Sequence, residues 1–395
     1  MWLRLWSTIG ALAVVAFLAA CGQAAPDRTS TSAAANPAPA AASAAGAAGA
    51  PSDWAQIVAA GKQEGEVIVW SSGGADVRQF EKDAFEKAYP GIKVTLFQPP
   101  SGSERDSRFL QEYQAGVAKV DVMITSSAGA NARLKPAGSL RDLRPFLLLP
   151  EVTDVANWRD HKLSWVDAEQ QFILQSDMRI TPNLLAHESV NLAEVQNWSD
   201  LLNPTWRGKM VMTDPRKSGD GLALTLFLYY SPELGPEYVR RLFGEMDVTF
   251  SPDQRQNAEW VRSGRMLLNL RPDNREVTQL LDLGAKVQVV PALKAQGRTI
   301  DSSGGSDGIL FLPNLDPLPH PNATKVYVNW FYSKAGQQAM VDIVERASRR
   351  LDVNHSKLPD YARPVPGVDY LNLNLFTEPE QVEAMRDEVT RAYAK

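Results

Sequence analysis

The sequence predicts an α/β protein whose chain forms two lobes. Short apolar runs that resemble buried strands alternate with amphipathic helical segments, first over residues 54–124 and again over residues 171–290. Strands that alternate with helices favour open, doubly wound sheets, because the helices cover both faces of the sheet. The globular part, residues 52–395, also suits two domains, since one domain has about 100–200 residues.

The first block contains three strands and three helices. An amphipathic helix over 54–60 precedes the wholly apolar run Val-Ile-Val-Trp at 67–70, which is typical of a strand buried on both faces. A helix over 77–89 has apolar residues at helical spacing and is ended by Pro90 and Gly91. The remaining elements are a strand over 92–97, a helix over 104–116 and a strand over 120–124.

The second block repeats this alternation. Strands are predicted over 171–180, 208–213, 265–270 and 286–290, and helices over 198–202 and 222–230. A last amphipathic helix is predicted between 378 and 395. The two blocks therefore predict two α/β lobes linked in one chain.

The loops after the predicted strands of the first block are rich in serine and glycine. In open α/β sheets, ligands bind beyond the carboxyl ends of the strands. Small residues let a ligand approach backbone N–H groups, and hydroxyls can donate to it or accept from it. Ordinary turns also favour Ser and Gly, but such loops recur at one edge of the same sheet. We therefore predict ligand-binding roles for Ser71, Ser72, Gly73, Ser126 and Ser127.

The loop between the predicted strand at 208–213 and the helix at 222–230 is a further candidate site. Free N–H groups and the helix dipole favour an anion at such a position. Arg216 could form a bidentate pair with a carboxylate or a phosphate-type oxyanion. The alternative is that Asp214 and Arg216 only shape the turn. We predict that Asp214, Arg216, Ser218 and Gly219 contact the ligand.

The first residues have the features of a secretory signal. A basic start with Arg4 and an apolar run from 9 to 20 lead to Leu-Ala-Ala-Cys, which resembles the lipobox of bacterial lipoproteins. We expect residues 1–20 to be a signal peptide and Cys21, the single cysteine, to carry a lipid. The run is shorter than the ~20 residues of a transmembrane span. Residues 21–52, rich in Ala and Pro, are expected to be a disordered linker.

Several function classes find no support in the residues. The net charge is −5 and no long basic run occurs, so we expect no nucleic-acid partner. The four histidines lack metal-ligand spacing, and no phosphate-loop motif occurs, so no metal or cofactor is expected. The Gly-x-Ser-x-Gly pattern at 304–308 is followed by a strand-like run rather than a helix. We therefore do not expect an enzyme.

Four segments resemble a known family. They read EGEVIVWSSGG, NWSDLLNPTWRGKMVMTDPRKSGDG at 197–221, VNWFYSKAGQQAM at 328–340 and RASRRLDV at 346–353. They resemble bacterial extracellular solute-binding proteins of the iron-type, ferric-binding-protein-like group, which serve ABC importers. The resemblance implies a two-lobed, type II periplasmic-binding-protein-like fold with a hinge and an interlobe cleft. It also implies a small-molecule solute, an ABC permease as partner and a periplasmic or cell-surface location.

The resemblance also suggests a division of the chain. We expect residues 53–172 and 305–345 to form lobe 1 and residues 173–304 to form lobe 2. Residues 346–395 are expected to be a C-terminal segment that packs on the lobes. The protein is expected to be a monomer held at the membrane by the lipid on Cys21.

The chain departs from the iron-binding members of this group at one position. Those members hold ferric ion with adjacent tyrosines after a strand of the second lobe, but the corresponding stretch here contains Arg271. Ferric ion prefers anionic oxygen ligands, whereas a guanidinium favours an anion. We interpret Tyr229 and Tyr230 as packing residues and expect a small organic or phosphorus-containing anion as the ligand. Ferric binding, or a sensor that docks on a receptor kinase, stays the alternative.

Overall fold

A computed structural model describes residues 53–71, 75–99, 102–124, 127–217, 219–303, 308–366, 368–376 and 378–394. Ser72, Gly73, Ser126 and Ser218 lie outside the described residues, as do the predicted signal peptide, the linker and Cys21. Across the described ranges, no helix combines the length and apolar character that a membrane span requires.

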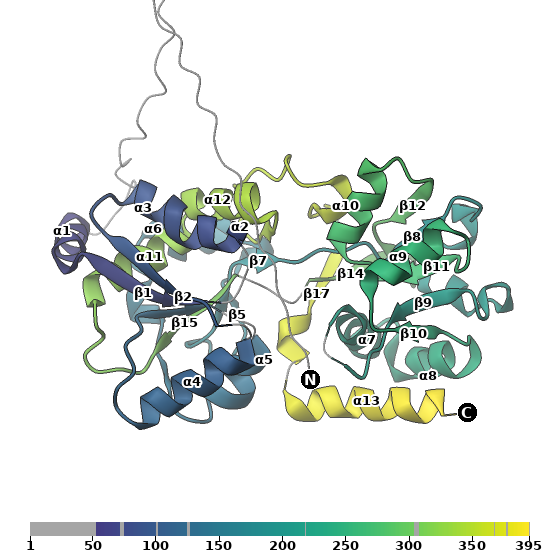
Figure 1. The fold of residues 1–395 in the computed structure, drawn as a ribbon, viewed down its shortest axis with the longest axis horizontal. Helices are drawn as coiled ribbons and strands as arrows, with labels where there is room; N and C mark the ends of the chain where they lie inside the picture. The colour runs from purple at the N-terminus through teal and green to yellow at the C-terminus, as the bar shows by residue number, and fades with distance from the viewer. Residues whose placement is uncertain are drawn as a thin grey trace, which may run out of the picture. The chain divides into compact units, whose positions relative to one another are not determined.

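The first lobe is built on a seven-stranded sheet with the order β2-β1-β3-β15-β6-β5, to which β4 adds by pairing with β15. Figure 1 labels β1, β2, β5 and β15 of this sheet. Its strands are β1 (Glu66–Trp70), β2 (Lys93–Phe97), β3 (Val122–Ile124), β4 (Leu140–Arg141), β5 (Ser164–Trp165), β6 (Leu174–Gln175) and β15 (Ile309–Pro313). The expected parallel pairing holds for β2, β1 and β3. Strand β15 is antiparallel to β3, because it enters this sheet from the second lobe instead of through a crossover helix.

Helices cover both faces of this sheet. They are α1 (Trp54–Glu64), α2 (Ala75–Arg78), α3 (Phe85–Ala88), α4 (Gly102–Gln114), α5 (Ser127–Gly129), α6 (Pro150–Thr153), α11 (Pro321–Tyr332) and α12 (Lys334–Val344). The helix predicted over 77–89 is interrupted by a π-helical stretch, Gln79–Ala84, between α2 and α3. Such stretches occur often near functional sites, and this one carries the buried Glu81.

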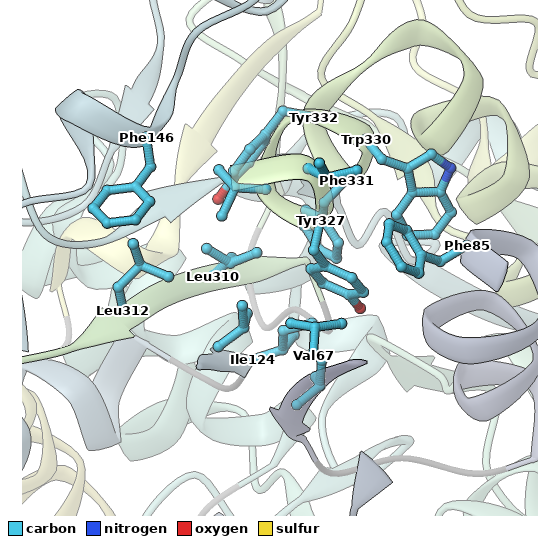
Figure 2. Packing of buried hydrophobic residues seen from close by; sticks show 14 of the residues in the cluster. Val67, Phe85, Ile124, Phe146, Leu310, Leu312, Tyr327, Trp330, Phe331 and Tyr332 are labelled. Carbon is cyan, nitrogen blue, oxygen red and sulfur yellow. The ribbon is translucent and has the colours of Figure 1, made fainter. Parts of the chain in front are cut away.

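The core on one face of the first sheet is rich in aromatic rings. Phe85 lies 4.8 Å from Tyr327 and 5.3 Å from Trp330, measured between ring centroids. Figure 2 shows these rings packed over Val67 and Leu310 of the sheet. Because successive side chains of a strand point to opposite faces, Leu310 lies in this core while its neighbours Ile309 and Phe311 lie in the core beneath α4.

The second lobe is built on a five-stranded sheet with the order β10-β9-β11-β8-β12. Its strands are β8 (Leu184–His187), β9 (Met210–Thr213), β10 (Thr249–Ser251), β11 (Leu268–Leu270) and β12 (Val287–Val290). Its helices are α7 (Asp220–Tyr230), α8 (Gly235–Glu245), α9 (Gln254–Arg262) and α10 (Asn274–Asp282). Strands β10, β9 and β11 are parallel, whereas β8 and β12 run antiparallel to their neighbours.

The predicted strand over 171–180 is divided between two sheets. Its first part is β6, and its second part is β7 (Asp177–Met178), which pairs with β16 (Ala347–Ser348). The division occurs because the chain leaves the first sheet here and joins the second at β8. It returns through β14 (Arg298–Ser303), which pairs with β13 (Leu293–Ala295) and β17 (Asp369–Asn372).

The C-terminal segment packs against the second lobe. After β17 come a short 3₁₀ helix, Leu373–Phe376, and the amphipathic helix α13 (Pro379–Tyr393). Helix α13 lies along α8 and α7, as Figure 1 shows. Its Met385, Val389 and Ala392 side chains are buried in the core of that lobe.

Candidate oxyanion-binding site

Two neighbouring strands of the second lobe, β9 and β11, end side by side at the carboxyl end of the sheet. Strands β9 and β11 are parallel neighbours, so the loops after Thr213 and after Leu270 leave the sheet at the same edge. The first of these loops leads to the N-terminus of α7 at Asp220. The Gln254 Nε2 donates to Asp220 Oδ2 at 3.1 Å and to the Arg271 carbonyl oxygen at 3.5 Å. The start of α7 and the residue after β11 are therefore neighbours.

Arg271 is the central residue of this edge. Its side chain is 1% exposed, and its backbone has a φ of 52°, a conformation uncommon for residues other than glycine. The Nη1 donates to Ser302 Oγ at 2.6 Å, and the backbone N–H donates to the Asn183 carbonyl at 2.8 Å. The Nε and Nη2 atoms are buried and have no hydrogen-bond partner within the described part of the chain.

The two unpartnered nitrogens form one side of the guanidinium. Parallel N–H groups on this edge match two oxygens of a carboxylate or phosphoryl group. Burial lowers the pKa of Arg271, while the nearby Asp220 and Asp301 act in the opposite direction. The guanidinium nevertheless stays charged at neutral pH. A buried cation with two unsatisfied donors is unfavourable, so this edge is suited to an anion.

Neighbouring carboxylates do not pair with Arg271. Arg179 binds Asp220 through Nη1 at 2.7 Å and Asp273 through Nη2 at 2.9 Å. Asp273 also accepts from the backbone N–H of Arg275 and caps α10. These two carboxylates are thus held by another arginine, which leaves the Nε–Nη2 edge of Arg271 without a protein partner in the described ranges.

Two buried carboxamides belong to elements near Arg271, one on β11 and one on α9. Asn269 lies on β11, two residues before Arg271, which follows the strand. Asn257 lies one turn after Gln254 on α9, and α9 packs against β11. Both carboxamides are fully buried, and their side-chain nitrogen and oxygen atoms lack partners in the described residues. Buried polar groups are almost always hydrogen-bonded, so each of these carboxamides also favours a polar partner.

Arg216 has a different environment from Arg271. Its Nε and Nη2 donate to the two carboxylate oxygens of Asp214 at 2.8 and 2.9 Å. The guanidinium also lies 5.5 Å from the ring centroids of Phe250 and Tyr393. The hydrogen bond from Arg216 lowers the pKa of Asp214. The pair thus links two residues of its own loop and contacts α13 through Tyr393, and the predicted ligand roles of Asp214 and Arg216 stay predictions.

Gly219 lies at the start of α7 with a φ of 135°, where a residue with a Cβ would be strained. The following Gly221 has its N–H bonded to Thr213 Oγ1 at 2.7 Å. A Cβ on Gly221 would lie 2.1 Å from the carbonyl oxygen of Thr213. The two glycines let the chain turn tightly from β9 into α7 beside Arg271.

Of the serines predicted as ligand contacts in the first lobe, Ser71 and Ser127 are described, and both are buried. Ser71 donates from Oγ to Glu81 Oε2 at 2.5 Å. Ser127 donates from Oγ to Asn374 Oδ1 at 2.9 Å and so joins the first lobe to the C-terminal segment. Both hydroxyls therefore bind protein groups in this structure, and neither contacts Arg271.

Comparisons with known proteins reveal a shared fold. No family model and no curated protein matches the sequence. The apo ferric ion-binding protein A of Pasteurella haemolytica aligns with a TM-score of 0.60 at 15% identity, over 83% of this chain and 98% of that chain. The IdiA (FutA) protein of Trichodesmium, in complex with iron and citrate, aligns with a TM-score of 0.62 at 16% identity, over 84% and 100%. The chain has a two-lobed, type II periplasmic-binding-protein-like fold.

A third solved structure with this fold is AfuA from Actinobacillus pleuropneumoniae with bound fructose-6-phosphate. It aligns with a TM-score of 0.54 at 13% identity, over 83% of this chain and 98% of that chain. The resemblance found in the sequence motifs is thus confirmed for the fold. The periplasmic-binding-protein-like fold is shared by proteins whose ligands differ in chemistry, so the ligand has to be argued from this chain's own residues.

Sequence reasoning found Arg271 but missed the residues around it. Asn183, Ser302 and Gln254 hold Arg271 in place, and Asp301 lies beside them. One available signal was the alternation in Leu268–Arg271, where Asn269 and Arg271 alternate with two leucines. Polar residues two apart in an apolar strand share one face, and this pattern indicates a buried polar surface.

Proposed function

We propose that this protein is an extracytoplasmic solute-binding protein that captures a small organic or phosphorus-containing anion and delivers it unaltered to an ABC permease. The observation that carries the proposal is the buried, unpartnered Nε–Nη2 edge of Arg271. The fold supports the transport role, because the solved structures that share it include the substrate-binding protein of an ABC transporter from Agrobacterium tumefaciens. AfuA, which binds fructose-6-phosphate, offers a precedent for a phosphorylated ligand in this fold.

In this proposal the anion is held by charge-assisted hydrogen bonds. Two of its oxygens pair with Nε and Nη2 of Arg271, and the N-terminus of α7 at Gly219 contributes its dipole. Because the Arg271 edge is closed to solvent in this structure, entry requires the lobes or their loops to open. Motion of lobes about connecting strands is the usual way in which clefts of this kind open and close.

The first lobe would complete the site. Ser71 and Ser127, together with Ser72, Gly73 and Ser126 outside the described residues, stay predicted ligand contacts from the first lobe. Ser218, also outside the described residues, stays a predicted contact from the second lobe. Ser127 would have to release Asn374 in order to donate to a ligand. We also retain the proposed lobe boundaries, 53–172 with 305–345 and 173–304, and the monomeric state.

A ferric ion is the second candidate ligand, favoured by the iron-binding proteins among the solved structures with this fold. The adjacent tyrosines of this chain serve packing. Tyr230 donates from its hydroxyl to the Gln381 carbonyl at 2.9 Å, and its ring stacks on Phe376 with centroids 4.6 Å apart. Burial raises the pKa of Tyr230, which disfavours the phenolate that ferric ion requires.

Isothermal titration of the mature protein tests the two ligand classes. The panel comprises carboxylates, phosphonates, sugar phosphates and ferric citrate. We expect at least one iron-free anion to bind the wild-type protein. Its affinity for Arg271→Lys should be much lower, because lysine keeps the positive charge but lacks the two parallel N–H donors of the guanidinium. Arg216→Gln is the matched control, because Arg216 already pairs with Asp214. Binding of ferric ion alone, abolished by Tyr230→Phe, would establish the second candidate instead.

The membrane anchor and the location rest on Cys21 and are tested separately. We expect the mature chain to incorporate labelled fatty acid in its host, and Cys21→Ser to be released from the membrane fraction. Co-purification with a permease rather than a receptor kinase distinguishes delivery for import from sensing. Recovery of the bound anion with unchanged mass tests whether the protein binds its solute without converting it.

A further inference from the structure

Asp301 on β14 is held by the same residues that hold Arg271. The backbone N–H of Ser302 donates to Asp301 Oδ1 at 2.7 Å, while the Ser302 hydroxyl accepts from Arg271. The side-chain Nδ2 of Asn183 donates to the same Asp301 oxygen at 2.9 Å. The backbone carbonyl of Asn183 accepts from the backbone N–H of Arg271. Two residues therefore fix the positions of both charged groups relative to each other.

The side chains of Asp301 and Ser302 leave β14 in opposite directions, and a cavity borders Asp301. Successive side chains of a strand point to opposite faces, and Ser302 points towards Arg271. The cavity has a volume of about 220 Å³, and Arg271 does not line it. Its lining consists of Phe227, Ser231, Pro232, Glu233, Arg298, Ile300, Asp301, Tyr370 and Leu371. The cavity is large enough for water, so a proton can reach Asp301 without passing through the Arg271 site.

Asp301 is the group of this cluster that changes charge near neutral pH. Burial raises its pKa to about 7, although Arg271 and the hydrogen bonds from Ser302 and Asn183 act in the opposite direction. Within the cavity, Glu233 pairs with Arg298 at 3.2 Å. Burial raises the pKa of Tyr370 to about 12, so its hydroxyl stays neutral.

Three further charged groups lie near this pair, two beside Arg271 and one beside Tyr370. Asp220 and Arg179 act on Arg271, and they are bound to each other. Arg159 lies 5.5 Å from the ring centroid of Tyr370. Among the described residues around Asp301, Arg271 is the cation whose charge a bound oxyanion would neutralise.

We propose that Asp301 determines the affinity of the Arg271 site, and that capture of an oxyanion there is accompanied by uptake of one proton on Asp301. This inference rests on the proposed function. In the free protein, the positive charge of Arg271 favours the ionised carboxyl. A bound oxyanion cancels that charge and brings a negative charge close to Asp301, so the neutral carboxyl becomes the favoured form. The proton comes from solvent and is released again when the anion leaves.

The sign of the pH dependence follows directly. Well below pH 7, Asp301 is neutral in both the free and the bound protein, so it makes no contribution to the pH dependence of the affinity. Above pH 7 the free protein carries a carboxylate that must bind a proton on capture. The affinity then falls with rising pH, by at most tenfold per pH unit, until the pKa of the bound state is passed.

Titration calorimetry with sulfate, which keeps its charge above pH 3, tests the proposal on the mature protein. We expect uptake of about half a proton per sulfate at pH 7, seen as different heats in buffers of different ionisation enthalpy. Because the bound state keeps its proton, the affinity should fall roughly 30-fold between pH 6 and pH 8.5. Asp301→Asn, which is neutral and of the same shape, should bind with a flat pH profile. Glu233→Gln, which changes another carboxylate of the same cavity, should keep the wild-type slope.

The possible outcomes distinguish the role of Asp301 from the proposed function. Sulfate binding that depends on Arg271 but takes up no proton would overturn the role of Asp301 and leave the proposed function standing. A panel in which no anion binds would contradict the proposed function itself. If Asp301→Asn does not fold, the buffer dependence of the wild-type heats decides the question alone.

Discussion

Arg271→Met is the substitution that most clearly separates binding from folding. Arg271 is buried, makes one side-chain hydrogen bond, to Ser302, and leaves Nε and Nη2 without partners among the described residues. Methionine is of similar length, so it fills much of the same space, and it accepts the positive φ no less readily than arginine does. The substitution therefore removes the charge without opening a large cavity.

The expected effects on stability and affinity are unequal. Losing the Ser302 hydrogen bond costs about 1 kcal/mol, while removing an unpaired buried charge returns a comparable amount or more. The free energy of unfolding should therefore change by less than about 2 kcal/mol in either direction. Two charge-assisted hydrogen bonds to an oxyanion contribute about 3 kcal/mol or more, so the anion affinity should fall roughly 150-fold or further.

Urea unfolding and isothermal titration on the same preparation measure both quantities. The wild-type protein should be stabilised by saturating anion, whereas Arg271→Met should show little stabilisation. The reasoning is refuted if the variant is strongly destabilised yet binds the anion as tightly as the wild type. That result would make Arg271 a structural residue whose free edge has no ligand.

Three further predictions concern neighbouring groups. The pKa of Asp301 is raised from 3.8 to about 7, so between these values the folded state binds more protons than the unfolded state, and the free energy of unfolding falls as pH rises. Relative to wild type, Asp301→Asn should therefore gain about 2–3 kcal/mol more free energy of unfolding at pH 8 than at pH 5, measured with urea. An equal gain at both pH values would contradict the assignment. Arg216→Gln should lower the free energy of unfolding by about 1–2 kcal/mol, because it loses the ion pair with Asp214 and the contacts with Phe250 and Tyr393. The anion affinity should stay within about twofold of the wild-type value. A large loss of affinity would show that Arg216 is a ligand residue. Ser127→Ala removes the donor to the buried Asn374 and should cost about 1–3 kcal/mol by thermal or urea unfolding, and an unchanged stability would show that this bond is not maintained in solution.

The sequence was sufficient to predict the alternating elements because burial on both faces leaves a clear apolar signal. The run at 67–70 and the parallel order of β2, β1 and β3 follow from it. The stretch 171–180 was assigned to one strand because its apolar pattern is continuous, but Ser176 lies where the chain leaves one sheet for another. Local pattern does not reveal which sheet supplies the pairing partner.

The site was harder to predict because its contacts join distant parts of the chain. Ser127 and Asn374 are 247 positions apart, and Arg216 meets Tyr393 of the last helix. Loop position indicated that Ser127 and Arg216 lie at strand ends, but not which partners their side chains would find there. Arg271 was identified because it stands in the stretch that corresponds to the tyrosine pair of the iron-binding proteins that the sequence resembles. Its burial and its unpartnered edge became visible only in the fold.

The central claim is that an oxyanion binds the Nε–Nη2 edge of Arg271. A crystal structure of the protein with selenate, whose anomalous signal marks the anion directly, is the most direct test. The account predicts a selenium peak with anion oxygens within hydrogen-bond distance of both nitrogens. Crystals that bind selenate elsewhere and leave this edge against protein atoms alone would contradict it.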